Sequence, residues 1–216
     1  MIKIRLQFSK TGPLRYIGHL DFLKVFQQTI RRAKLPMVYS KGFNPHMQLS
    51  FALPLPLGMT SVNDYADIVI EHDLSGDEII SRFNAHAPNG LTLSKAWPFD
   101  GPGAAALAVS ADYLLTEKVD AEAIKSLLSQ ETLVIPKKTK SGIKDTDIRP
   151  DIFDISTTEE GVAMSLAAGS GRFLNPLIVA KLLIGHDIPT SSLIRQELYR
   201  MDNTKGLIPL YEAPIF

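Results

Sequence analysis

The spacing of apolar residues along the first hundred positions constrains the fold more than any other feature of this sequence. Residues 2–8 alternate apolar and polar side chains, as a half-buried strand does. From His19 to Lys34 the apolar residues recur at helical spacing, and Pro36 ends that helix. Further strands are expected around residues 37–39, 48–53, 65–71 and 91–96, with a helix at 77–86. This β-α-β-β-α-β order, with some extra extended structure in the middle, is the ferredoxin-like pattern.

A second unit with a similar rhythm follows a linker rich in proline and glycine at residues 98–103. Its strands are expected at 111–116, 132–136, 151–156 and 162–167, and its helices at 120–129, 176–184 and, as a short one, 191–199. We therefore expect an α+β fold of two ferredoxin-like units with antiparallel sheets. The first is a basic N-terminal domain at 1–98, and the second is a C-terminal α+β domain at 106–216 that carries a basic loop at 137–144.

The chain of 216 residues has no cysteine, which excludes several classes of chemistry. Iron–sulfur clusters, thiolate zinc sites and cysteine nucleophiles all need that side chain. No apolar run approaches the 18 residues of a membrane-spanning helix, and the N-terminus has the pattern of a strand, not of a signal peptide. We expect a cytoplasmic protein without a membrane segment, a cofactor or a bound metal.

The net charge of zero hides a segregation of charge along the chain. Residues 1–60 hold nine Lys and Arg residues and a single acid, Asp21, whereas residues 61–131 hold four basic and twelve acidic residues. Clustered basic side chains create a positive field that attracts phosphates whatever the net charge. The alternative is that the acidic segment folds beside the basic one and neutralises it internally.

Two polar loops at the edge of the basic region, residues 15–21 and 39–46, carry the candidate catalytic residues. His19, Asp21 and His46 could bind a divalent metal or exchange protons, because imidazole titrates near neutral pH. A His-x-Asp triplet is weak support for a metal site, however, and Asp21 in a first helical turn also stabilises the helix dipole. The simpler interpretation, a capped helix start, is preferred.

Basic and aromatic residues in the loops are candidates for contacts with nucleic acid. Residues 41–44, Lys-Gly-Phe-Asn, could surround a phosphate with backbone amides, although they lack the spacing of a nucleotide P-loop and could equally form a simple turn. Four lysines and Arg149 lie within residues 137–149, which suits either a phosphate-contacting loop or a solvated hairpin tip. Only Tyr16, Tyr39 and Phe43 remain as aromatic residues on which bases could stack.

Several of these segments together resemble one bacterial family, the radical-SAM-linked proteins, a domain of unknown function. The resemblance rests on the runs at 10–21, 31–36, 39–46 and 50–58, and on Lys140-Ser141-Gly142 followed by residues 147–150. Gly18 stands where a serine is expected, and Met47 where a proline is usual. The resemblance implies a gene beside, or fused to, a radical-SAM protein with a cobalamin-binding-type domain, and an association with an endoribonuclease of the E/G type. Because a radical-SAM enzyme holds its cluster with three cysteines, this chain could only assist one.

We therefore expect a non-catalytic accessory module that binds RNA or ribonucleoprotein and works with a separate radical-SAM enzyme. The side chains expected to contact nucleic acid are Arg15, Lys24, Arg31, Arg32, Tyr39, Lys41, Gly42, Phe43, Asn44, Lys138, Lys140 and Arg149. One alternative is a metal-independent RNA-processing or RNA-modifying enzyme that uses His19 and His46. A second alternative is a protein-docking subunit whose interface is the acidic segment at 61–131.

Overall fold

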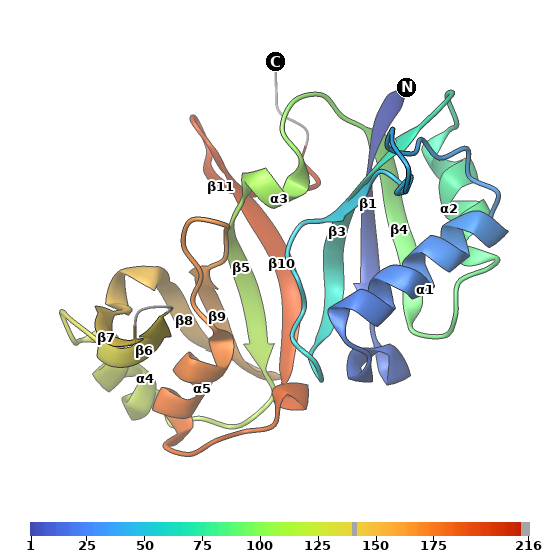
Figure 1. Ribbon diagram of the computed structural model, residues 1–216. Coiled ribbons are helices and arrows are strands. Elements are labelled where there is room, and N and C mark those ends of the chain that lie inside the picture. The colour runs from blue at the N-terminus through green and yellow to red at the C-terminus, as the bar shows by residue number, and fades with distance from the viewer. Residues whose placement is uncertain (140–141, 213–216) are drawn as a thin grey trace.

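One large, mostly antiparallel sheet organises the molecule, and α-helices accompany it (Figure 1). The computed structural model describes residues 1–139 and 142–212. Within this part of the chain the sheet has nine strands, in the order β4-β1-β3-β10-β5-β9-β8, with β2 also paired to β3 and β11 to β10. The other two strands, β6 and β7, form a separate hairpin.

The N-terminal half contributes four strands and two α-helices. They are β1 (Ile2–Lys10), the short 3₁₀ helix η1 (Gly12–Tyr16), α1 (His19–Arg32), β2 (Leu49–Phe51), β3 (Thr60–Ile70), α2 (Gly76–Asn84) and β4 (Leu91–Pro98). Strand β1 is antiparallel to β3 and to β4, and β2 is antiparallel to β3. The β-α-β-β-α-β order expected for this half is therefore the order of its strands and α-helices.

The side chains that point to one face of β1 form the core of this half. Ile4, Leu6 and Phe8 are buried on one face, where Phe26 of α1 and Phe83 of α2 pack together with a centroid distance of 4.9 Å. Removing such aromatic and aliphatic side chains from water is the main stabilising contribution to a core of this kind.

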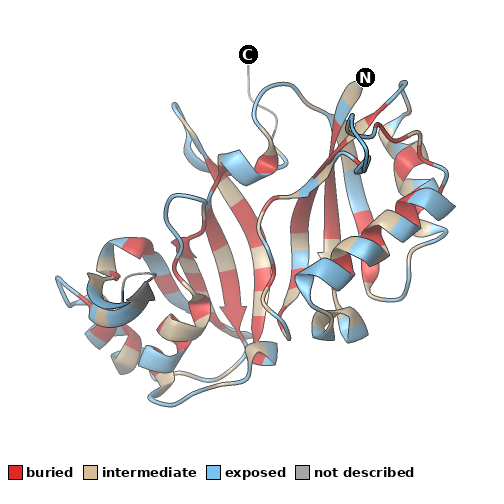
Figure 2. Cartoon of the chain, viewed as in Figure 1, coloured by how far each residue is buried: buried red, intermediate tan, exposed pale blue. Residues whose placement is uncertain are grey.

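The C-terminal half contributes the remaining strands and three α-helices. They are α3 (Ala104–Leu107), β5 (Ala108–Leu115), α4 (Ala121–Leu128), β6 (Val134–Thr139), β7 (Gly142–Asp147), η2 (Arg149–Asp151), β8 (Ile152–Thr158), β9 (Gly161–Ala167), α5 (Pro176–Ile184), η3 (Thr190–Ser192), β10 (Leu193–Asp202) and β11 (Gly206–Pro209). Helices α4 and α5 cover the buried side chains of β5, β8 and β9. Figure 2 shows buried residues concentrated in the central strands of the sheet.

The two halves share one sheet because β10 lies beside β3. These strands run parallel and pair at Ile194 with Thr60 and at Arg195 with Ser61. Beside this pairing, Arg195 Nη2 donates to Asp64 Oδ2 at 2.5 Å, and both side chains are almost completely buried. Our expectation of a separate sheet in each half is thus replaced by a continuous sheet.

Two local expectations for the C-terminal half are also corrected. The helix expected at 191–199 is wrong: after η3 these residues form the first seven positions of β10, whose Leu193 and Leu198 are buried in the core. The basic loop expected at 137–144 is largely the β6–β7 hairpin. In the described part of the chain, every helix is too short or too polar to span a bilayer.

Candidate nucleic-acid interface

A loop closed at its base by backbone contacts projects from the N-terminal half. Tyr39 and Met47 form an isolated antiparallel bridge. Next to this bridge, the Ser40 amide donates to the His46 carbonyl at 2.8 Å, and the His46 amide donates to Ser40 Oγ at 2.9 Å. These contacts hold the two arms together, so residues 41–45 extend from the base as the loop tip.

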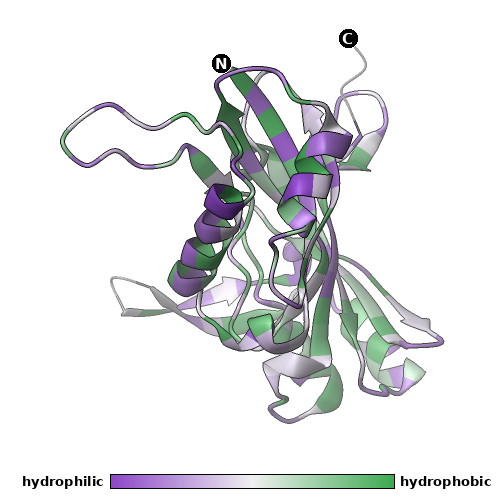
Figure 3. Cartoon of the chain, turned by 90° about the vertical axis from the view of Figure 1, so that its right-hand side faces the viewer, coloured by the Kyte–Doolittle hydropathy of each residue, from purple (hydrophilic) through white to green (hydrophobic). Residues whose placement is uncertain are grey.

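The loop tip presents an aromatic ring to solvent. Phe43 is fully exposed, and its neighbours Lys41 and Asn44 are exposed as well. Figure 3 shows the loop extending beyond the rest of the molecule on the same side as α1. Gly42 has a φ of +126°, which other residues rarely adopt, and a Cβ there would meet nothing within 4 Å. Gly42 is therefore suited to this position by its backbone conformation, and not by a lack of space for a side chain.

The last turn of α1 adds two exposed arginines to this region. Arg31 and Arg32 end the helix, and the chain reaches the base of the loop seven residues later. Earlier in the helix, Lys24 donates to Asp21 at 3.0 Å, with both side chains exposed. An exposed pair of this kind leaves Lys24 free to exchange partners at little cost.

Part of the positive charge of residues 1–60 is neutralised inside the protein. Arg5 Nε donates to Asp67 Oδ1 at 2.8 Å, with both side chains buried. Lys10 is buried close to Asp64, and burial lowers the pKa of its ammonium group. The acidic segment thus takes two of the nine basic residues out of the surface, while the loop and the end of α1 keep theirs.

The remaining basic candidates have structural partners or lie in the hairpin. Arg15 stacks over the exposed ring of Tyr16, with 4.8 Å between the guanidinium carbon and the ring centroid. All three guanidinium nitrogens of Arg149 donate to backbone carbonyls at 3.1–3.2 Å, which fixes the start of β8 against the end of α4. Lys138 belongs to β6, and Lys140 lies outside the described residues.

The two candidate catalytic histidines line different hollows. His19 packs edge-on against Phe51 and borders a hollow of about 10 Å³ together with Lys10 and Asp64. His46 borders a shallow groove of about 480 Å³ at the base of the loop. Across residues 1–139 and 142–212, no group of three or more His, Cys, Asp or Glu side chains is placed to hold a metal ion.

Residues 3–176 match the model of a protein family described as an uncharacterized protein conserved in bacteria, DUF2344. The chain belongs to this family. No curated protein matches it. The matched residues include α1, the projecting loop and the β6–β7 hairpin, whereas β10 and β11 lie beyond them.

A buried ionic cluster beside His19 was not among the residues that the sequence singled out. Burial raises the pKa of the Asp64 carboxyl, against the attraction of Arg195, which acts to lower it. The alternation of β1 contained a signal for Lys10, because this residue continues the buried set of Ile4, Leu6 and Phe8. No local pattern indicated Arg195, whose partner is 131 positions away.

Proposed function

We propose that this protein is a non-catalytic RNA-binding accessory module. The observation that carries the proposal is the fully exposed Phe43 on a projecting loop, flanked by Lys41 and Asn44. Exposed aromatic rings are costly in water, whereas in RNA-binding proteins they stack on unpaired bases. A lysine and an amide beside the ring supply a phosphate contact and a base-edge contact.

The end of α1 extends this surface with charge. Arg31 and Arg32 are exposed and unshielded by acidic neighbours in the helix turn to which they belong. Basic side chains of this kind fix the position of a nucleic-acid backbone without reading its sequence. Single-stranded RNA fits the surface better than a duplex, because a ring on a loop tip can stack only on a base that is unstacked.

The partner that we propose is a separate radical-SAM enzyme. Support comes from the resemblance of the segments at 10–21 and 39–46 to radical-SAM-linked proteins. A chain without cysteine cannot hold the three-cysteine cluster, so its part would be to present a substrate to that enzyme. An endoribonuclease of the E/G type is a second proposed partner on the same resemblance.

We also infer that each half is a ferredoxin-like unit. The support is the strand order, β4-β1-β3-β2 in the first half and β10-β5-β9-β8 in the second, with neighbours antiparallel within each half. In both halves a helix follows the first strand and another precedes the last, and β6–β7 is an additional hairpin in the second half. Sheets of this topology commonly bind RNA in other proteins.

Binding of a fluorescent single-stranded RNA of twelve nucleotides, measured at several salt concentrations, tests the proposed function. We expect affinity that falls with salt, because each phosphate contact releases a counterion. Arg31→Glu/Arg32→Glu should reduce affinity at least about tenfold and lower the salt slope by about two. The matched control is Lys118→Glu/Lys125→Glu, which makes the same charge change on exposed residues near α4 and should have little effect.

Two phenylalanine variants test the proposed stacking of a base on Phe43. Phe43→Ser should weaken binding by about five- to a hundredfold, since one base stacked on an aromatic ring contributes about 1–3 kcal/mol. Phe153→Ser removes another exposed phenylalanine, on β8, and should leave affinity unchanged. Absence of binding at low salt, or equal losses in both variants, contradicts the proposal.

A further pair of variants addresses the enzyme alternative. His19→Ala should leave RNA affinity within about twofold, because its ring packs against Phe51 and belongs neither to the loop tip nor to the end of α1. His46→Ala alters the groove at the base of the loop, so its informative readout is turnover of the RNA. Conversion of the RNA by the wild-type protein, lost in either variant, would favour a catalytic role over an accessory one.

A further inference from the structure

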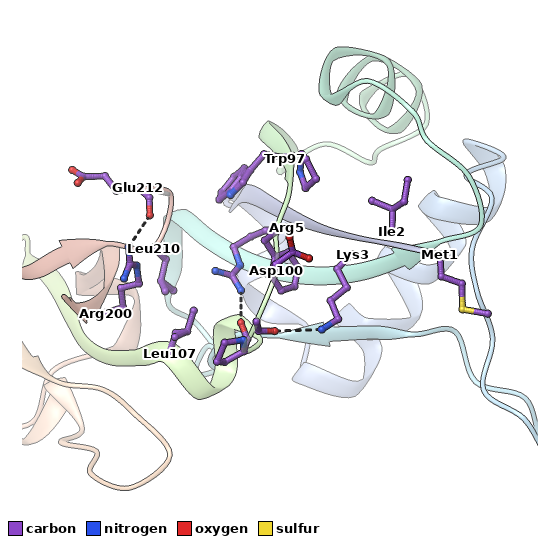
Figure 4. Close-up of a pocket in the computed structure, with 14 residues that line it drawn as sticks. Met1, Ile2, Lys3, Arg5, Trp97, Asp100, Leu107, Arg200, Leu210 and Glu212 are labelled. Atoms are coloured by element: carbon purple, nitrogen blue, oxygen red, sulfur yellow. Dashed lines mark hydrogen bonds between the residues drawn. The ribbon is translucent and has the colours of Figure 1, made fainter. Parts of the chain in front are cut away.

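A cleft opens at the ends of the strands where the two halves meet. Its volume is about 840 Å³, within the range of small-molecule sites. One wall comes from β1 and β4, and the other comes from β10 and the segment after β11; Leu107 of α3 closes one side (Figure 4). Its lining includes Lys3, Arg5, Trp97, Phe99, Leu107 and Arg200. None of them belongs to the projecting loop or to α1.

A buried arginine points into this cleft. The Arg5 side chain is 5% exposed and is held by two hydrogen bonds to Asp67 and a third, from Nη2, to the Pro102 carbonyl at 3.2 Å. Its guanidinium carbon lies 4.3 Å from the centroid of the Phe99 ring. Among the described residues, Nη1 has no hydrogen-bond partner, and Figure 4 shows the guanidinium group directed into the cleft. Because Asp67 balances the charge of Arg5, the contribution of this residue to anion binding is a hydrogen-bond donor held in place, Nη1, rather than net positive charge.

Two further cations border the same space. Lys3 Nζ donates to the Gly101 carbonyl at 3.3 Å, and Arg200 Nη2 donates to the Glu212 carbonyl at 3.2 Å. Lys3 has no ion-pair partner among the described residues, so its charge remains available to a ligand. Arg200 Nη1 also lies 3.7 Å from Asp202 Oδ2, so that carboxylate partly balances the charge of Arg200. The Glu212 carboxylate lies 3.9 Å from Lys205, which offsets its charge at the rim.

The carboxylates of Asp100 and Glu212 also line the cleft, and the rest of the lining is mainly apolar and aromatic. Trp97, the single tryptophan of the chain, lies at one end of the cleft, and its ring meets Tyr65 edge-on at 6.4 Å. Leu107 and Leu210 face it from α3 and from the segment after β11 (Figure 4). A planar ring can therefore lie against Trp97 while an attached anion reaches the cations.

We propose that this cleft binds a nucleotide, with its base against Trp97 and its phosphate at Lys3, Arg5 and Arg200. The cleft has room for a base, a sugar and one phosphate together. The nucleotide could come free from solution or be part of an RNA. The groove at the base of the loop shares Lys3 and Phe99 with the cleft, so a strand bound at the loop could continue into it. Only binding of a nucleotide within RNA rests on the proposed function.

Fluorescence of Trp97 provides a direct test with the chain of 216 residues. It is titrated with adenosine 5′-monophosphate, with adenosine and with inorganic phosphate. We expect a saturable change with the nucleotide, at least about tenfold tighter than with either part alone, because only the nucleotide makes both contacts. Lys3→Glu should weaken nucleotide binding about tenfold or more, whereas the charge-matched Lys118→Glu should not. Equal binding of adenosine, equal binding of phosphate, or no response overturns the proposal.

A second experiment distinguishes a free nucleotide from a nucleotide within RNA, and the cleft proposal from the loop-interface proposal. Oligoadenylate is titrated against the wild-type protein and against Phe43→Ser, again with Trp97 as the reporter. If the nucleotide site takes free ligand, the monophosphate binds both proteins equally. If it takes an RNA nucleotide, oligoadenylate changes Trp97 fluorescence, the monophosphate competes with it, and Phe43→Ser weakens only the oligonucleotide. RNA binding without any change at Trp97, with either ligand, refutes the cleft and leaves the loop interface standing.

Discussion

The ion pair between β3 and β10 gives the sharpest prediction about stability. Arg195 has no exposed surface, and the Asp64 side chain is 5% exposed. Asp64→Ala leaves the Arg195 guanidinium buried with uncharged partners, the backbone carbonyls of residues 53 and 54 and the Tyr113 hydroxyl. Removing one partner of a buried pair typically costs about 3–5 kcal/mol, because the remaining charge is uncompensated. We expect a loss of that size in the free energy of unfolding.

Urea denaturation followed by far-UV circular dichroism measures this loss. The control is Asp187→Ala, which breaks a pair with Lys181 at 2.8 Å whose side chains are 86% and 55% exposed. That variant should lose less than about 1 kcal/mol. Asp64→Leu/Arg195→Met removes both charges of the pair but leaves Lys10 buried without its carboxylate partner, so it should recover part of the stability lost in Asp64→Ala. A loss below about 1 kcal/mol for Asp64→Ala would refute the view that this pair stabilises the junction of the two halves.

Three further measurements test individual sites. Burial raises the pKa of Glu197 from 4.5 to about 7. Between these pH values the folded protein holds a proton that the unfolded chain has lost, so the free energy of unfolding should decrease by about 1–3 kcal/mol as the pH rises. Urea denaturation midpoints of Glu197→Gln should not show this decrease. Gly161 has a φ of +147°, and a Cβ there would collide with the Leu115 carbonyl. Gly161→Ala should therefore lower the free energy of unfolding by about 2–3 kcal/mol, measured in a thermal melt. The control Gly206→Ala, where the space is open, should lower it by about 1 kcal/mol or less. Asn175 accepts a hydrogen bond from the first turn of α5, and calorimetry of Asn175→Ala should show a loss of about 1 kcal/mol.

The order of elements could be predicted largely from local patterns. Period-two alternation identified β1, helical spacing identified α1, and Asp120 and Asn175 cap helices where the pattern placed their starts. Residues 191–199 were mistaken for a helix because buried positions of β10 are occupied by the charged residues Arg195 and Glu197, so burial alternates along the strand while hydrophobicity does not.

The candidate site was predictable only in part. Exposure of Phe43 and of the two arginines that end α1 follows from a polar loop and a polar helix face, and both were visible in the sequence. The cleft was not, because it joins Lys3 and Arg5 to Arg200 across almost the whole chain. Contacts of such sequence separation depend on sheet order, which one sequence does not reveal.

The position of β10 has a consequence for the route by which the protein folds. Its ten residues begin at position 193, yet the strand lies between β3 and β5 at the centre of the sheet. During synthesis, β1 to β4 can pair long before β10 emerges from the ribosome, and until then the start of β3 at Thr60 and Ser61 and one edge of β5 lack their partner strand. Closing the sheet is then a late, long-range step, which slows folding and leaves two strand edges open to pairing with other chains.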